Sequence, residues 1–119
     1  MSDIEKRWPD LEKTASGLRY KVLKTGTGTK PTKGTLVTVH YKGELLNGTV
    51  FDSSYERNSP AQFTIGQVIP GWNEALLDMK KGEKRLLVIP PELGYGKRGA
   101  GGVIPPNAYL VFEVELIDF

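Results

Sequence analysis

The last quarter of the chain decides its fold: Gly94-Tyr95-Gly96, then Val103-Ile104-Pro105-Pro106, then Leu110-Val111-Phe112-Glu113-Val114-Glu115-Leu116. The first two stretches are rich in glycine and proline, as connecting loops are. The third alternates apolar and polar residues, which predicts a strand with one buried face. Leu110, Phe112, Val114 and Leu116 share that face. A loop beside an apolar strand face is a layout suited to a binding pocket.

Composition limits the possible classes of protein. A chain of 119 residues with 39% hydrophobic and 25% charged residues fits one small globular domain. Its net charge is +2, and basic residues alternate with acidic ones, as in Glu83-Lys84-Arg85. This pattern argues against nucleic acid as the main partner. No run of residues has the length of a signal-peptide core or a membrane span, so we expect a soluble, cytoplasmic monomer without a membrane partner.

Several kinds of chemistry are excluded by residue type. The chain has no cysteine and one histidine, His40, so it forms neither a disulfide framework nor a Cys/His zinc site, and we expect no metal or cofactor. It has no G-x-S-x-G elbow, Walker loop or H-E-x-x-H helix. His40 shares a predicted strand face with Thr38 and Lys42 and has no obvious partner to orient it as a base. We therefore interpret His40 as structural.

The periodicity predicts an α+β fold, with about five strands in a mostly antiparallel sheet and one helix across it. The helix is expected over 70–80, with Pro70 at its first position and Lys80-Lys81 complementing its C-terminal dipole. Asn47-Gly48 marks a tight turn. The expected strands are 18–23, 36–46, 50–52 resuming at 62–65 after an interruption, 84–89 and 109–118.

Residues 1–17 are predicted to be an N-terminal extension, and residues 18–119 the domain. Ser2 and Glu5 form a capping box, and Ile4, Trp8 and Leu11 recur at helical spacing, so a short helix is expected there. Three alternatives fit the extension: it packs on the sheet edge, docks a partner or is partly disordered, and Trp8 favours packing.

The remaining conspicuous residues are aromatic and aliphatic, with few polar neighbours. They have two interpretations, a plain core or the wall of a pocket. Trp72 lies in the first turn of the predicted helix, and Asp52 directly follows Phe51 in a predicted strand. A carboxylate placed against aromatic rings favours the pocket.

The order of short motifs along the chain resembles that of the FKBP family of peptidyl-prolyl cis-trans isomerases, over about residues 18–119. Each motif is weak alone, but seven in the right order and spacing are specific. They are Val39-His40-Tyr41, Phe51-Asp52-Ser53-Ser54, Arg57-Asn58, Val68-Ile69-Pro70-Gly71-Trp72, Gly94-Tyr95-Gly96, Ile104-Pro105-Pro106 and the strand at 110–116.

The resemblance implies a five-stranded antiparallel half-barrel around one short helix, with a pocket between them. It implies catalysis of X-Pro bond rotation during protein folding, through desolvation and hydrogen bonding, without covalent or acid-base chemistry. The implied partners are X-Pro-containing polypeptides and the macrolides tacrolimus and rapamycin. The residues carried over as catalytic are Tyr41, Asp52, Tyr95 and Phe112. Those carried over as substrate-binding are Phe51, Arg57, Phe63, Val68, Ile69, Trp72 and Ile104.

Two positions depart from the family pattern. Ala61 stands where the best-known members have a phenylalanine, and Ala100 where many have a histidine in the flap. Both changes weaken one wall or rim of the implied pocket, which bears on macrolide affinity more than on activity.

Two other functions fit the sequence. One keeps the fold without catalysis, as a module that binds a Pro-containing segment. The other is a small β-barrel that binds nucleic acid or protein through its surface, with every aromatic residue in the core; steep salt dependence would favour it.

Overall fold

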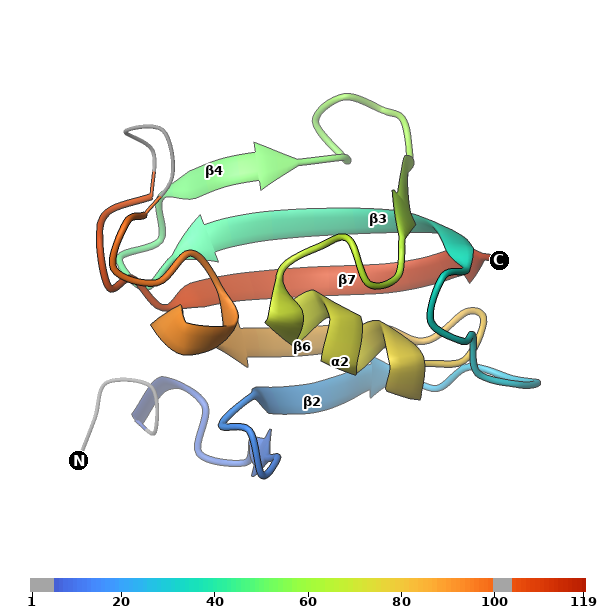
Figure 1. Cartoon of the computed structure of the whole chain (residues 1–119), viewed down its shortest axis with the longest axis horizontal. Helices are drawn as coiled ribbons and strands as arrows, with labels where there is room; N and C mark the ends of the chain where they lie inside the picture. Colours follow the sequence, from blue (N-terminus) through green and yellow to red (C-terminus); the bar gives the residue numbers. More distant parts are fainter. Residues whose placement is uncertain (1–5, 100–103) are drawn as a thin grey trace.

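The computed structural model describes residues 6–99 and 104–119, which form a curved antiparallel sheet with one helix lying across it (Figure 1). The strand order is β1-β2-β6-β7-β3-β4, and β5 pairs with β3 outside this path. The helix is α2 (Pro70–Asp78), and a short 3₁₀ turn, η1 (Pro91–Leu93), follows β6. The strands are β1 (Glu12–Lys13), β2 (Arg19–Lys24), β3 (Leu36–Leu45), β4 (Val50–Ser53), β5 (Ala61–Thr64), β6 (Lys84–Ile89) and β7 (Leu110–Asp118).

The predicted α+β class is confirmed, but the sheet has seven strands rather than five. The interrupted strand is two strands, because β4 pairs with the end of β3 around Gly43 while β5 pairs with its beginning around Val37. The additional strand, β1, has two exposed residues, too few to display a period.

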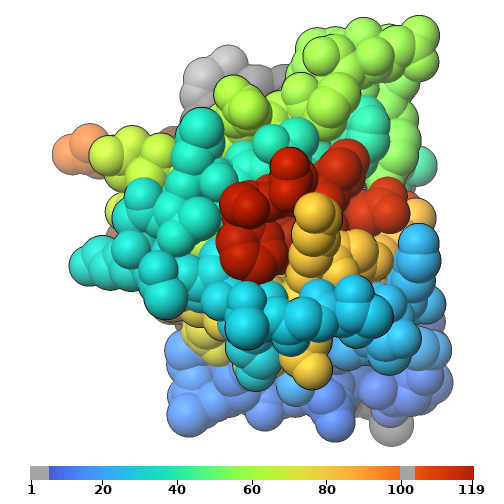
Figure 2. Space-filling view, turned by 90° about the vertical axis from the view of Figure 1, so that its right-hand side faces the viewer, coloured from blue at the N-terminus to red at the C-terminus, as the bar shows by residue number. Residues whose placement is uncertain are grey.

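The last strand in the sequence occupies the middle of the sheet. β7 pairs with β3 on one side, from Thr38↔Asp118 to Leu45↔Leu110, and with β6 on the other. Figure 2 shows the end of β7, in red, enclosed by segments from much earlier in the chain, in cyan and light blue, and by the gold segment before β6. Gly82 N–H donates to the Leu116 carbonyl at 2.7 Å and helps to close this end.

The core lies between the inner face of the sheet and α2. Leu110, Val114 and Leu116 of β7 are at most 1% exposed, as their alternation predicts. The helix covers them with Trp72, Ala75, Leu76 and, just after its last turn, Met79. Each such side chain contributes about 1.5–3 kcal/mol when fully buried. Within the described ranges, no helix is long and apolar enough to cross a bilayer.

The helix ends two residues before the predicted Lys80, and the expectation that Lys80-Lys81 complement its dipole was wrong. Met79 adopts an extended conformation, and the Lys80 N–H turns away to donate to Glu83 Oε1 at 3.1 Å. The cation at the helix end comes instead from β6. Arg85 Nη2 donates to the Asp78 carbonyl at 3.1 Å. Tertiary packing thus replaces the local signal.

The N-terminal segment crosses the outer face of the sheet. Arg7 donates to the Leu46 carbonyl and to Glu44 Oε1, each at 3.0 Å, and its guanidinium lies 4.3 Å from the Trp8 ring centre. The same segment then forms β1 beside β2, at the opposite edge of the sheet. The predicted capping box of Ser2 and Glu5 lies outside the described residues. The division at residue 17 stays a prediction.

Candidate functional site

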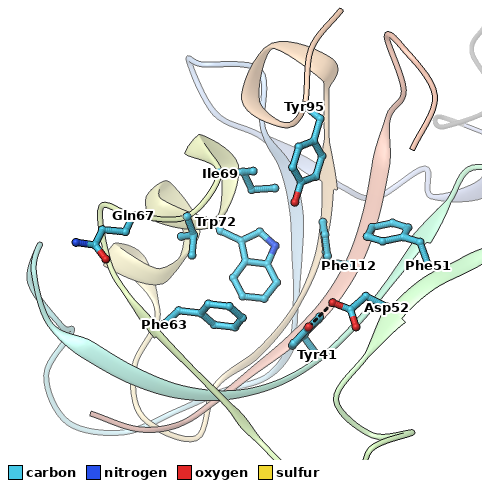
Figure 3. Close-up of a pocket in the computed structure, with 10 residues that line it drawn as sticks. Tyr41, Phe51, Asp52, Phe63, Gln67, Ile69, Trp72, Tyr95 and Phe112 are labelled. Carbon is cyan, nitrogen blue, oxygen red and sulfur yellow. Dashed lines mark hydrogen bonds between the residues drawn. The ribbon is translucent and has the colours of Figure 1, made fainter. Parts of the chain in front are cut away.

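A cavity of about 470 Å³ opens between α2 and the inner face of the sheet (Figure 3). This volume is in the range of sites for small molecules and short peptide segments. Strands β3, β4, β5 and β7, the start of α2 and the loop after η1 all contribute to it. Its lining residues are Tyr41, Phe51, Asp52, Phe63, Gln67, Val68, Ile69, Trp72, Tyr95 and Phe112.

The walls are aromatic rings packed edge to face around Trp72. Its ring centre lies 5.2 Å from that of Tyr41, 5.3 Å from that of Phe63 and 5.2 Å from that of Phe112. Edge-to-face pairs at this spacing are favoured by the ring quadrupoles, so each ring fixes its neighbour. Trp72 is 4% exposed, and its buried Nε1–H has no acceptor among the described residues. The result is a rigid floor of low polarity.

Gly43 makes room for two of these rings. A Cβ atom on this β3 residue would lie 2.6 Å from the Phe112 ring and 2.8 Å from the Phe51 ring. Phe51 and Phe112 meet each other edge to face at 5.5 Å. The absence of a side chain at Gly43 therefore allows this wall to close against the sheet.

One side of the pocket carries a polar triad. The Tyr41 hydroxyl donates to Asp52 Oδ2, and Arg57 Nη1 donates to Asp52 Oδ1 at 2.5 Å. Arg57 Nη2 also donates to the Tyr41 hydroxyl oxygen at 2.9 Å. Each of the three side chains thus fixes the other two.

Within the triad, the pKa of Asp52 and the pKa of Tyr41 are shifted in opposite directions. Burial alone would raise the pKa of Asp52, but hydrogen bonds from Tyr41 and Arg57 outweigh it and lower this pKa below its ordinary value. Burial, and then the bond to Asp52, raise the pKa of Tyr41. At neutral pH Asp52 is therefore a carboxylate and Tyr41 a neutral donor, an arrangement that orders the pocket rather than one that transfers protons.

Besides the buried Trp72 Nε1–H, two donors remain for a bound ligand. The Ile69 N–H precedes the first turn of α2 and has no acceptor in the described part of the chain. Tyr95 is 40% exposed, and its hydroxyl points into the cavity in Figure 3. The cavity therefore combines apolar walls with a backbone donor and a hydroxyl.

Sequence reasoning named all of the lining residues except Gln67. Gln67 follows the turn at Gly66, and its closeness to Val68 and Ile69 was the available signal. Two of the predicted residues do not line the cavity: Arg57 reaches it through Asp52, and Ile104 is 5% exposed within the core. The roles assigned to all of these residues stay predictions.

Three other positions lie outside the pocket or outside the described residues. His40 Nδ1 lies 2.9 Å from Ser54 Oγ, and its ring stacks on Tyr55, which agrees with a structural role. Ala61 packs against the core. Ala100 lies outside the described residues.

Comparisons with known proteins agree on one family. Residues 27–117 match the FKBP_C family, described as FKBP-type peptidyl-prolyl cis-trans isomerase. The chain is 53% identical to peptidyl-prolyl cis-trans isomerase Mip of Coxiella burnetii over 95% of its length, and 57% identical to FK506-binding protein 1 of Dictyostelium discoideum over 87%. The crystal structure of FkpA from Escherichia coli superposes with a TM-score of 0.91 at 46% identity and covers 98% of the chain.

The relatives differ in length. The chain spans 49% of the Coxiella protein and 55% of the FkpA chain, but 98% of the Dictyostelium protein. It therefore corresponds to about half of the longer relatives and to nearly all of the shorter one.

Proposed function

Because the chain belongs to the family of FKBP-type peptidyl-prolyl cis-trans isomerases, we propose that it catalyses rotation about X-Pro bonds in polypeptides, including folding chains. The observation that carries this proposal is the aromatic cavity around Trp72, whose described lining has donors but neither a Ser, Cys or Lys nucleophile nor a His base. Bond rotation is a reaction that requires neither.

The barrier to this reaction is amide resonance, about 18–20 kcal/mol. Unaided X-Pro isomerisation takes tens to hundreds of seconds. In the twisted transition state the C–N bond loses double-bond character, and the carbonyl oxygen carries less charge than in the planar amide. A dry apolar site therefore disfavours the planar state relative to the twisted one.

We propose a role for each part of the pocket. The substrate proline ring occupies the bowl of Tyr41, Phe51, Trp72 and Phe112, where little water remains. The Ile69 N–H and the Tyr95 hydroxyl hold substrate carbonyl groups. Arg57 and Asp52 keep Tyr41 in place. An acceleration of about 10⁵-fold corresponds to about 7 kcal/mol of preferential transition-state stabilisation.

The alternative of a non-catalytic module has less support. A site that only binds an extended Pro-containing segment does not need to enclose the proline ring. In this pocket, Trp72 and its edge-to-face neighbours form a floor that covers one face of the proposed proline position. Two relatives that share 53% of the aligned residues, from Coxiella burnetii and Escherichia coli, are named as peptidyl-prolyl cis-trans isomerases.

We also propose that the pocket binds tacrolimus and rapamycin, since the Dictyostelium relative is named for binding FK506. The pocket retains its aromatic bowl, while Ala61 lacks the ring that the family pattern places there.

We further propose, from the sequence, that the protein is a monomer and acts in the cytoplasm. Size-exclusion chromatography with light scattering would test the oligomeric state.

The deciding experiment is protease-free isomerisation of Leu-Pro and Phe-Pro peptides, followed by NMR exchange, with and without tacrolimus. We expect acceleration that the drug abolishes. A folded protein that binds the peptides without accelerating their isomerisation would support the non-catalytic module instead. Acceleration that the drug leaves unchanged would contradict the macrolide proposal alone.

A further inference from the structure

We propose that Asn73 is a positioning residue that aims the Ile69 N–H into the pocket. Asn73 does not line the cavity, and its side chain bonds to the backbone of the preceding loop. The inference rests on the proposed function for its catalytic readout, but its structural content is independent of it.

The loop between β5 and α2 forms one wall of the pocket and has few other ties. Gln67 N–H donates to the Thr64 carbonyl at 3.0 Å and closes a turn in which Gly66, at the third position, has φ +107°. A turn with positive φ at this position favours glycine. The next three residues, Gln67, Val68 and Ile69, all line the cavity.

Asn73, in the first turns of α2, spans this loop with both ends of its amide. Its Oδ1 accepts the Gly66 N–H at 2.8 Å, and its Nδ2 donates to the Val68 carbonyl at 2.9 Å. The two bonds hold the loop on either side of Gln67, the first of the three wall residues.

The second bond also sets the orientation of the next peptide group. The described part of the chain contains no cis peptide bonds, so the Val68 carbonyl and the Ile69 N–H point in opposite directions across one planar unit. With the carbonyl held toward the helix by Asn73, the N–H faces away from Asn73. Ile69 lines the pocket, and this N–H has no acceptor within the described residues. Asn73 therefore keeps a free donor available for a substrate carbonyl.

At neutral pH the amide of Asn73 supplies the acceptor and the donor that the two partners require. A carboxylate accepts from Gly66 but has no proton for the Val68 carbonyl, and a hydrocarbon side chain satisfies neither. Asn73→Asp is thus nearly isosteric and selectively removes the bond that orients the Ile69 N–H.

This variant carries its own pH signature. At neutral pH the introduced carboxylate repels the Val68 carbonyl, whereas its protonated form donates to it. Contact with the Val68 carbonyl oxygen raises the pKa of the introduced carboxyl from its ordinary value of about 3.9, whereas the Gly66 N–H and the first turn of α2 favour the charged form and lower it. Two charged side chains near the site have opposite effects on this pKa: Lys33 lies against Gly66, and Glu74 is the next residue of α2. Function should return when the pH falls below this pKa.

The experiment measures kcat/KM for a Leu-Pro peptide and the backbone amide signals of Ile69 and Gly66 between pH 7 and pH 4. For Asn73→Asp we expect about a tenfold lower kcat/KM than wild type at pH 7, since one hydrogen bond to the substrate is lost. The ratio should approach one as the introduced carboxyl becomes protonated. The Ile69 amide signal should move with the same titration, while Gly66 stays bonded.

Asn47→Asp is the matched control. Asn47 Oδ1 accepts the Thr49 N–H at 2.9 Å in the turn before β4, a bond that aspartate retains, and the change of charge is the same. We expect wild-type activity and no shift of the Ile69 signal.

Two outcomes would overturn the inference: equal kcat/KM for Asn73→Asp and Asn47→Asp at pH 7, or an Ile69 amide signal that does not respond to the titration. Should the wild-type protein itself prove inactive, the proposed function fails, and the Ile69 signal alone decides the role of Asn73. Loss of folding in Asn73→Asp would be tested against Asn73→Ser, whose shorter side chain removes both bonds without adding charge.

Discussion

Arginines form ion pairs near both ends of α2, in opposite environments. At the pocket end, Arg57 pairs with Asp52, and the two side chains are 50% and 41% exposed. At the far end, Arg85 pairs with Glu83, and both side chains are at most 8% exposed. The far end leaves little unsatisfied, because Arg85 also bonds to the Asp78 carbonyl and Glu83 to the Lys80 N–H. Among the described residues, the pocket end has no side-chain cap on the helix and no acceptor for the Ile69 N–H.

Because of this difference, we expect substitutions at the far end of the nine-residue helix to affect stability, and substitutions at the pocket end to affect ligand binding. A buried charge that loses its partner remains desolvated, so the far end is sensitive to substitution. An exposed ion pair is compensated by water, so the pocket end can be altered at little cost to the fold. The helix is anchored at one end, and the groups that meet a ligand are at the other.

The largest expected effect is a loss of stability when the buried ion pair at the far end of α2 is removed. Arg85→Met leaves Glu83 buried without its cation and should lower the free energy of unfolding by about 3 kcal/mol in urea titrations. We expect kcat/KM of the folded protein to change by less than about twofold. Lys81→Met is the control, because Lys81 bridges Asp118 at 3.1 Å with its side chain 58% exposed and should cost less than about 1 kcal/mol. Equal free energies of unfolding for the two variants would contradict the contrast between buried and exposed ion pairs.

A smaller effect is expected at the pocket end, and on activity alone. Tyr95→Phe removes one hydroxyl and should lower kcat/KM by up to about tenfold, while the free energy of unfolding stays within about 0.5 kcal/mol of wild type. Tyr55→Phe is the matched control, since Tyr55 is also 40% exposed but stacks on His40 away from the cavity. If the two variants had the same activity, the donor role of Tyr95 would be wrong.

The smallest expected effect is the loss, at acidic pH, of the stability that Asp52 contributes through its pair with Arg57. The pKa of Asp52 is lowered in the folded state, so its contribution is present above the unfolded value of about 3.9 and is lost as the pH falls through the folded value. The stability difference between wild type and Asp52→Asn should therefore be largest at neutral pH and shrink below about pH 4. Because the Asp52 side chain is 41% exposed, we expect only a few tenths of a kcal/mol. A difference that grew on acidification would reverse the assigned direction of the shift.

The strands and the pocket were predictable where local pattern decides the outcome. The alternation in β3 and β7 gave the buried faces, and the order of motifs gave nearly all of the lining residues. Gly43 could not be recognised as a wall residue, because its role depends on rings that come from β4 and β7. Arg85 could not be recognised as the partner of the helix end, since β6 approaches α2 only in the folded chain.

The local signals misled where two of them competed. Lys80 and Lys81 fit the rule for a helix C-terminus, but Glu83 draws the Lys80 N–H out of the helical path. Asn73 looks like any polar residue on a helix, and its importance appears only when its amide is matched to the Gly66 N–H and the Val68 carbonyl. Bonds from a side chain to a distant backbone group leave no periodic trace in a sequence.

The position of β7 has a consequence for synthesis in the cell. Because this strand lies between β6 and β3, both of its neighbours leave the ribosome before the strand that joins them. Until Leu110–Asp118 emerges, β3 and β6 have unpaired edges, which are sites for contact with other nascent chains. Pairings between segments so far apart in sequence also form slowly. Assembly of the sheet therefore waits for β7, and a protein proposed to assist the folding of other chains passes through an exposed stage in its own.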